Sequence, residues 1–172
     1  MITPQPVYVV DLIKDVIDKV KVAYPSVNYQ HGHFLEIANT LQSWSDTSLD
    51  ERKYPLIALF QDFAETKSGT IGIDSEVSLH FIIATRTQRE YKAAERYTKT
   101  FKLILYPLYY EFMKQLQNSK YFMHAGDIPH TKIDRLFWGQ ETIFANTANN
   151  MHDYADCIEI QNLKLNVKPI KC

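Results

Sequence analysis

The sequence predicts an α+β protein, with a mostly antiparallel sheet that contains a long hairpin and is packed by an N-terminal helix and a long central helix. Apolar residues recur at three- and four-residue steps from 6 to 22 and from 87 to 118, which is typical of amphipathic helices. From Ile71 to Thr85 they alternate with polar residues, which is typical of a strand with one face on a core. The 172 residues, 45% of them hydrophobic, suffice for a single domain over 1–172.

The composition excludes several classes of protein. Nineteen basic and twenty acidic residues give a net charge of -1, so the chain lacks the positive field that non-specific nucleic-acid binding uses. Cys157 and Cys172 show no zinc or disulfide-framework spacing, which favours a reducing compartment. We expect neither a secretory signal at the N-terminus nor a membrane span, because no apolar run approaches ~20 residues. Eleven tyrosines suit partly wet interfaces as well as cores.

The first quarter of the chain predicts one helix and a loop. The helix is expected from Pro6 to Val22, and Tyr24-Pro25 ends it because the residue before proline is pushed toward extended geometry. Val27 to Ile37, rich in β-forming residues, predicts a short strand or hairpin. The polar stretch Thr40 to Lys53 predicts a connecting loop.

A hairpin of two strands is expected next. The apolar run from Tyr54 to Phe63 predicts a strand buried on both faces, and Ala64 to Thr70 predicts the turn that joins it to the alternating strand. The odd-numbered residues of that second strand should face the core. Its even-numbered polar residues should face solvent or a partner, and these are Asp74, Glu76, Ser78 and His80.

The second half predicts a long helix followed by strands. The helix should run from Thr87 to Asn118 with a kink at Pro107, whose ring removes a backbone donor. Three strands are expected, at Tyr121 to His124, Thr131 to Trp138 and Asp156 to Lys168. In the last of these the apolar positions change from even to odd, which predicts a bulge near Gln161-Asn162. Phe144 to His152 predicts a loop.

Two groups of residues offer side chains that could ligate a metal. His31 and His33 flank Gly32, but nothing nearby completes a set of three or four ligands. Asp127, His130 and Asp134 surround a turn and form an equally loose group. The more economical interpretation of both groups is solvated surface, and no metal or other cofactor is expected.

Glu65-Thr66-Lys67 resembles one half of the site of restriction-type nucleases, in which a carboxylate holds a divalent metal and a lysine assists the attacking water. The other half needs an upstream aspartate, and the candidates Asp46 and Asp50 lie in a polar segment. A metal-dependent nuclease or hydrolase therefore stays open as an alternative, with chance as the leading explanation of the motif.

Other catalytic patterns are missing from the sequence. There is no glycine-rich phosphate loop and no serine in a nucleophile elbow. Cys157 lies in an apolar strand, where a thiol is usually inert. The carboxylates of Asp153 and Asp156 lie near the entrance of the last strand, which indicates turn capping more often than acid-base chemistry. We expect no catalytic site.

The order of these elements resembles the tail-terminator, tail-completion and head-tail joining (neck) proteins of tailed bacteriophages and prophages. An amphipathic helix, the strand entry Tyr54 to Ile57 and a long alternating strand come first, Thr85 to Glu90 leads into a long helix, and Asp153 to Ile160 opens the closing strand. The resemblance spans Val7 to Val167. It implies a non-enzymatic virion subunit, assembled in the bacterial cytoplasm, that forms a six-fold or twelve-fold ring and binds connector, portal or tail-tube proteins. DNA would meet it only by passing through the ring lumen.

If the resemblance holds, a ring contact should join two different surfaces of neighbouring subunits. We expect it at the uncommitted polar strand face and at the hairpin loop, which together comprise Glu65, Thr66, Lys67, Ser68, Gly69, Asp74, Glu76, Ser78 and His80. The plainer interpretation is a solvated face, since antiparallel sheets often leave one side wet. A host adaptor that binds a protein partner through a tyrosine-rich surface is a further alternative.

Overall fold

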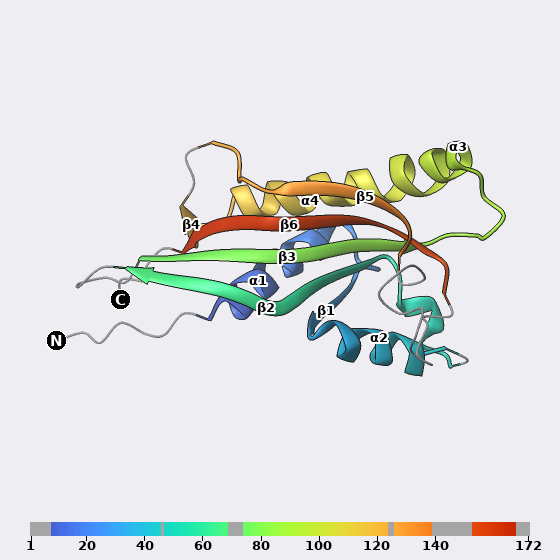
Figure 1. Cartoon of the computed structure of the whole chain (residues 1–172), viewed down its shortest axis with the longest axis horizontal. Helices are drawn as coiled ribbons and strands as arrows, with labels where there is room; N and C mark the ends of the chain where they lie inside the picture. The colour runs from blue at the N-terminus through green and yellow to red at the C-terminus, as the bar shows by residue number, and fades with distance from the viewer. Residues whose placement is uncertain (1–7, 46, 69–73, 124–125, 139–152, 168–172) are drawn as a thin grey trace.

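One mixed sheet forms the centre of the computed structural model, which describes residues 8–45, 47–68, 74–123, 126–138 and 153–167. The strand order is β1-β2-β3-β6-β4, with β5 also paired to β6 (Figure 1). The strands are β1 Asn28–Gly32, β2 Leu56–Ser68, β3 Asp74–Arg86, β4 Phe122–Met123, β5 Thr131–Trp138 and β6 Ala155–Val167. Of the strand pairs in the described ranges, only β1–β2 is parallel, so the predicted α+β class and mostly antiparallel sheet are confirmed.

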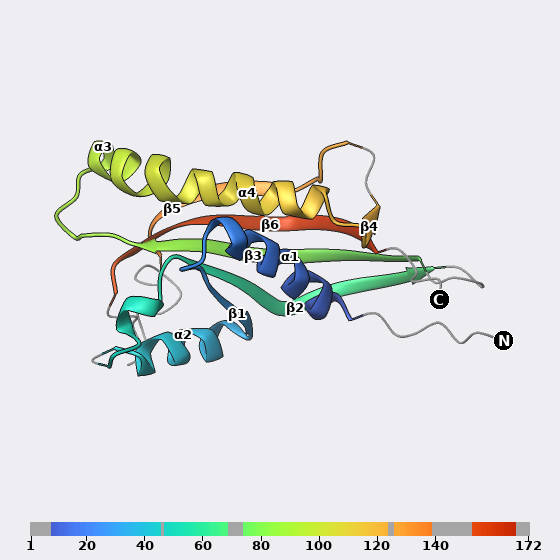
Figure 2. The same ribbon diagram turned by 180° about the vertical axis from the view of Figure 1, so that it is seen from behind.

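The helices cover both faces of this sheet unequally. They are α1 Val9–Ala23, α2 Phe34–Ser43, the 3-10 turn η1 Asp50–Arg52, α3 Ala93–Arg96, the π-helical segment η2 Tyr97–Leu105 and α4 Tyr106–Gln117. Helix α1 and the long helix formed by α3, η2 and α4 lie in front of the sheet in Figure 2. The odd-numbered apolar residues Val77, Leu79, Phe81 and Ile83 of β3 share one core with these helices and are fully buried, as the alternation predicted.

Helix α2 corrects two expectations. Residues 34–43 are helical, so the predicted strand or hairpin ends at Gly32 and the predicted loop begins only after Ser43. The His33 side chain begins the helix by accepting a hydrogen bond from the Leu35 amide at 3.2 Å. The buried face of α2, formed by Ile37, Ala38 and Leu41, covers the start of β2 and the end of β3 on the side opposite α1. A helix with so short an apolar face leaves little periodicity in the sequence.

Strand β2 is longer than expected. A shift of register between Phe60 and Ala64 lets it continue beside β3 as far as Ser68, so residues 64–68, which were predicted to belong to a turn, are strand. Burial is complete only from Leu56 to Leu59, and the outer half is largely exposed, which corrects the prediction of a strand buried on both faces. The hairpin connection itself, together with Gly69 and Ile71, lies outside the described residues.

The long helix continues through Pro107, as its periodicity predicted, but begins at Ala93 rather than Thr87. The irregularity expected at the proline takes the form of the π-helical segment η2, which ends immediately before α4, where Pro107 occupies the first turn. Because η2 precedes α4 without a break, Pro107 lies inside one continuous helix, and its missing backbone donor removes one intrahelical hydrogen bond there. None of the described helices is both long enough and apolar enough to cross a bilayer.

The closing strand β6 contains the predicted bulge. Leu163 pairs with Leu79, whereas Ile160 pairs with Phe81, so two residues of β6 stand opposite one of β3. Asn162 adopts a positive φ of 53° there. The bulge keeps the apolar residues on either side of it facing one core. The strands expected around Tyr121 and over 131–138 are confirmed as β4 and β5, and the loop expected at 144–152 lies outside the described residues.

Candidate interaction surfaces

The residues predicted to form one contact surface are divided between the two faces of the sheet. Residues directly opposite each other on neighbouring strands share a face. Glu76 pairs with Thr66 and Asn166 on the face opposite α1. Glu65 pairs with Val77, which is buried against the helices, so Glu65 lies on the helix-covered face. The sequence could not reveal this division, because it follows from the irregular register of β2.

On the helix-covered side, Glu65 belongs to a local polar group. Ser75 donates a hydrogen bond of 2.5 Å to Glu65 Oε1, and Lys67 Nζ lies 3.7 Å from Oε2. Lys67 pairs across the hairpin with Ser75, and Ser68 pairs with Asp74. These contacts fix the outer end of the hairpin.

The carboxylates required by the nuclease hypothesis do not meet. Asp50 lies at the opposite end of β3, where both its oxygens are 3.0 Å from Arg86 Nη2 and Oδ1 is 2.8 Å from Lys53 Nζ. Arg86 and Ser75, the neighbour of Glu65, are separated by roughly 35 Å of strand at about 3.3 Å per residue. Glu65 and Asp50 therefore cannot hold one metal ion, and Asp46 lies outside the described residues.

A charged cluster occupies the centre of the face opposite α1. The carboxylate of Glu159 on β6 contacts Arg135 Nε of β5 and accepts a hydrogen bond of 2.7 Å from Gln161. His80 Nε2 lies 2.9 Å from Glu159 Oε1, at ion-pair distance but without hydrogen-bond alignment, and its ring packs against Phe60 with centroids 4.8 Å apart. His80 is thus held by the fold rather than uncommitted, whereas the exposed Glu76 and half-buried Ser78 remain available.

The Glu159 carboxylate is favoured in its charged form by these neighbours. Burial is the largest influence and opposes ionisation, yet hydrogen bonds from Gln161 and Arg135 together with nearby positive charge hold the pKa of Glu159 below its ordinary value. Sequence reasoning missed this cluster, because its members come from three strands that only the β-sheet register brings together.

The histidines that could have ligated a metal have structural partners. His33 caps α2, and the ring of His31 stacks on Tyr29 with centroids 6.1 Å apart. His130 Nε2 lies 2.6 Å from the Tyr109 hydroxyl, and Nδ1 lies 2.7 Å from a backbone carbonyl. Within the part of the chain that the structure describes, no three His, Cys, Asp or Glu side chains converge as metal ligands would.

Asp153, just before β6, and Asp156, the second residue of β6, are partners of buried cations rather than the predicted turn caps. Asp153 lies 2.9 Å from Nζ of Lys53, a lysine with no exposed surface, and Asp156 accepts from the buried Arg96 at 2.7 Å. Desolvation explains these ion pairs, since a buried cation requires a carboxylate nearby. The Cys157 thiol that follows is buried, and burial raises its pKa far above the ordinary value, so its thiolate is disfavoured as the sequence predicted.

The sheet ends in two unlike edges among the described residues. At one side lie β1 and the outer half of β2, since β1 pairs with β2 only from Leu56 to Phe60. At the other side lie β5 and the short β4, which pair with different parts of β6. Figure 1 shows β1 and β5 at opposite margins of the sheet. Each edge exposes backbone groups that another strand can pair with.

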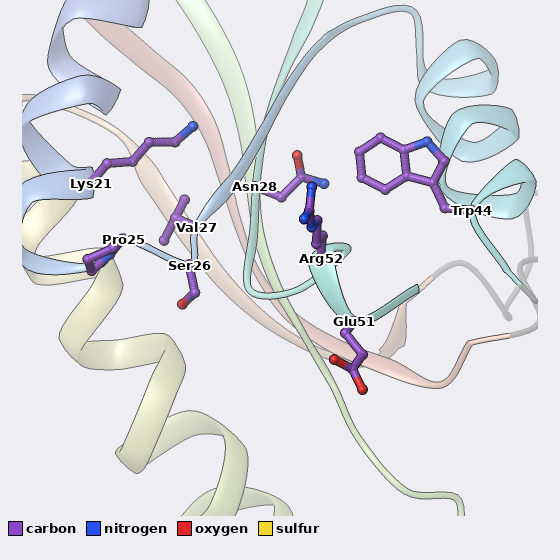
Figure 3. A pocket seen from close by; sticks show the side chains of 8 residues that line it. All are labelled: Lys21, Pro25, Ser26, Val27, Asn28, Trp44, Glu51 and Arg52. Atoms are coloured by element: carbon purple, nitrogen blue, oxygen red, sulfur yellow. The ribbon is translucent and has the colours of Figure 1, made fainter. Parts of the chain in front are cut away.

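An open pocket of about 410 Å³ lies where β1 begins, between the end of α1 and the segment after α2. Lys21, Arg52 and Trp44 point toward Asn28 from three sides, whereas Glu51 points away (Figure 3). The full lining consists of Lys21, Pro25, Ser26, Val27, Asn28, Trp44, Glu51 and Arg52. Sequence reasoning gave no sign of this pocket, because its residues were assigned to a helix end and a loop.

Comparisons with protein-family models, with curated protein sequences and with solved structures return no match to this chain.

Proposed function

We propose that this chain is a non-enzymatic structural subunit of a tailed bacteriophage or prophage, which forms a ring at the head-tail junction or at the tail end. The observation that carries the proposal is the pair of unlike, open edges at which the sheet ends. A ring of identical subunits needs a heterologous contact, in which one surface complements a different one on the next subunit. Pairing of β5 with the outer half of β2 of a neighbour would supply such a contact through backbone hydrogen bonds.

The polar face beside the outer half of β2 enlarges this contact. Thr66 and Glu76 are exposed there and Ser78 is half-buried, so these side chains can meet a neighbour without unfolding the subunit. A stable interface buries about 800 Å² on each partner, more than one strand edge alone provides. We therefore place the ring contact on the β2 edge together with this face.

The proposal extends to the partners of the ring. Adjacent virion proteins, such as a head-tail connector, the portal or the tail tube, would bind the two ends of the ring. DNA would only pass through its lumen. Assembly would take place in the bacterial cytoplasm before the ring joins the virion. The separation of Glu65 from Asp50 supports the non-enzymatic character, because it leaves the nuclease hypothesis without its second carboxylate.

The test combines particle mass with virion content. We expect native mass spectrometry and particle imaging of the purified chain, alone or with its neighbours along the virion axis, to show rings of six or twelve copies. We also expect the chain in purified virions of the phage or induced prophage that encodes it. Its absence from those virions would overturn the proposal.

Point substitutions locate the contact. Because Ala64 to Ser68 is strand, deleting it would remove β-sheet pairing, so substitutions on the polar face are more informative. Thr66→Lys combined with Glu76→Lys should leave the circular dichroism spectrum unchanged and abolish rings. Asp15→Lys, an equally exposed change on α1, should assemble normally. If the double variant still forms rings, the contact between subunits does not include this polar face.

A further inference from the structure

We propose that the pocket at the start of β1 binds an acidic, extended peptide segment of a partner protein, which adds to β1 as a further strand. Its carboxylate would lie between Lys21 and Arg52, and an adjacent apolar side chain would pack on Trp44. The inference goes beyond the proposed ring, which uses the outer half of β2 and β5, and does not depend on it.

The backbone of β1 is available for such a strand. The Asn28 amide donates to Pro55 O at 2.9 Å, so the peptide groups of Asn28 face β2. In a parallel pair, the N–H and C=O groups of successive residues point alternately toward the partner strand and away from it. The backbone groups of Tyr29 and His31 therefore face away from β2. Extended peptides bind exposed sheet edges through main-chain hydrogen bonds, while side-chain pockets supply the specificity.

The two positive charges that line the pocket favour an anionic side chain on the bound peptide. Lys21, at the end of α1, and Arg52, in η1, reach it from two elements. Neither cation forms an ion pair or hydrogen bond with a side chain in the described part of the chain, and the Glu51 carboxylate points away. Bonds from two such donors to one carboxylate are charge-assisted and stronger than neutral ones.

Trp44 gives the opposite wall its apolar surface. The residue caps the end of α2 and is half-buried, with its indole directed toward the pocket (Figure 3). Tryptophan and arginine are enriched among residues that dominate binding energy at interfaces. Successive side chains of an added strand point to opposite faces, so a peptide with alternating acidic and apolar residues would offer its two kinds of side chain to different walls.

A peptide fits these observations better than a nucleic acid. Cations beside a tryptophan could also hold a phosphate and stack a base, but a nucleic acid makes no use of the open β1 backbone. The net charge of -1 provides no long-range attraction for DNA or RNA. A single-stranded oligonucleotide is therefore the competitor that the experiment has to include.

The experiment measures fluorescence anisotropy of a labelled hexapeptide of alternating glutamate and valine added to the full chain. We expect saturable binding that weakens at least about tenfold in Lys21→Glu combined with Arg52→Glu, a change of ~1.4 kcal/mol in binding free energy. Lys102→Glu, an exposed charge reversal on η2, should bind as the unmodified protein does. A peptide of alternating lysine and valine should not bind.

Hydrogen exchange followed by NMR tests the strand addition. The amides of Tyr29 and His31 should become protected when the glutamate peptide binds, and those of α4 should not change. No saturable binding of the peptide, equal binding by the double variant, or unchanged exchange at both amides would each overturn the proposal. Displacement of the peptide by a single-stranded hexanucleotide at an equal or lower concentration would overturn it in favour of a nucleic acid.

The ring proposal is tested separately. Thr66→Lys combined with Glu76→Lys, which should abolish rings, should bind the glutamate peptide unchanged, because β1 and its pocket are intact. Rings without peptide binding would support the ring proposal and contradict the peptide proposal. Peptide binding without rings would support the peptide proposal and contradict the ring proposal.

Discussion

Asp156 of β6 accepts a hydrogen bond of 2.7 Å from Arg96 Nη1 of α3, and both side chains are buried. The same guanidinium donates to the backbone carbonyls of Tyr91 and Gln88, and its carbon lies 3.7 Å from the centroid of the Phe137 ring. The network fastens the start of the long helix to β6 and to the end of β5. Every charge in it has a partner.

Removing either member of this pair should be strongly destabilising. Arg96→Ala or Asp156→Ala leaves an uncompensated buried charge, which costs about 3–5 kcal/mol of the free energy of unfolding. Arg96→Leu combined with Asp156→Leu should cost less than the sum of the single changes, because neither charge remains. Urea denaturation followed by circular dichroism measures all of these. A loss below about 1 kcal/mol in the single variants would contradict a buried, dry pair.

Local patterns in the sequence predicted the parts of the fold that depend on neighbouring residues. The change from even to odd apolar positions is visible within the 13 residues of β6, so the bulge at Gln161-Asn162 and its strand were predicted correctly. Asp156 illustrates the opposite case. Its partner Arg96 is sixty residues away, and nothing around Asp156 distinguishes a buried ion-pair member from a turn cap.

The candidate site was only partly predictable for a related reason. The exposed position of Glu76 follows from the alternation of its strand. The opposite orientation of Glu65 follows from a register shift in β2 that leaves no local pattern. Prediction of the pocket that Trp44 lines would have required prediction of α2. The apolar face of this helix comprises too few residues to stand out from a polar segment.

The bulge makes Asn162 a position with a conformational requirement. Its φ of 53° lies in the left-handed region, which asparagine and glycine tolerate and β-branched residues do not. Asn162→Gly should be nearly neutral, whereas Asn162→Val should reduce the free energy of unfolding by about 1–2 kcal/mol. Asn166→Val, at an exposed position of the same strand, is the matched control and should be tolerated. Equal thermal shifts for both valine variants would contradict the strained backbone.

The Glu159 cluster predicts how stability depends on pH. Its pKa is lower in the folded chain than in the unfolded chain, so its contribution is fully present above the unfolded value of about 4.3 and is lost as pH falls through the folded value. Glu159→Gln should therefore flatten the acid limb of a plot of unfolding free energy against pH. Glu76→Gln, on the same face but exposed, should retain it, and an unchanged limb in Glu159→Gln would refute the assignment.

Tyr106 of α4 ties the long helix to β5, the outer edge in the proposed ring. Its hydroxyl donates a 2.6 Å hydrogen bond to Asp134 Oδ2, and this bond, with smaller effects of burial and the carboxylate charge, raises the pKa of Tyr106 to about 12. The bond stabilises the fold below the unfolded phenol pKa of about 10, and this stabilisation is lost as pH rises through the folded value.

Substitution of the acceptor should reverse this shift. In Asp134→Asn the NMR titration of the Tyr106 ring carbon should move toward the ordinary value of about 10, and amide exchange along β5 should quicken because one of its attachments to α4 is weakened. Tyr106→Phe assigns the signal and should speed exchange similarly. Tyr110→Phe, an exposed phenol on the same helix, should leave β5 unaffected. If exchange along β5 is the same in all three variants, then α4 does not hold this edge in place, and the pairing of β5 with β6 alone would have to position it for the proposed ring contact.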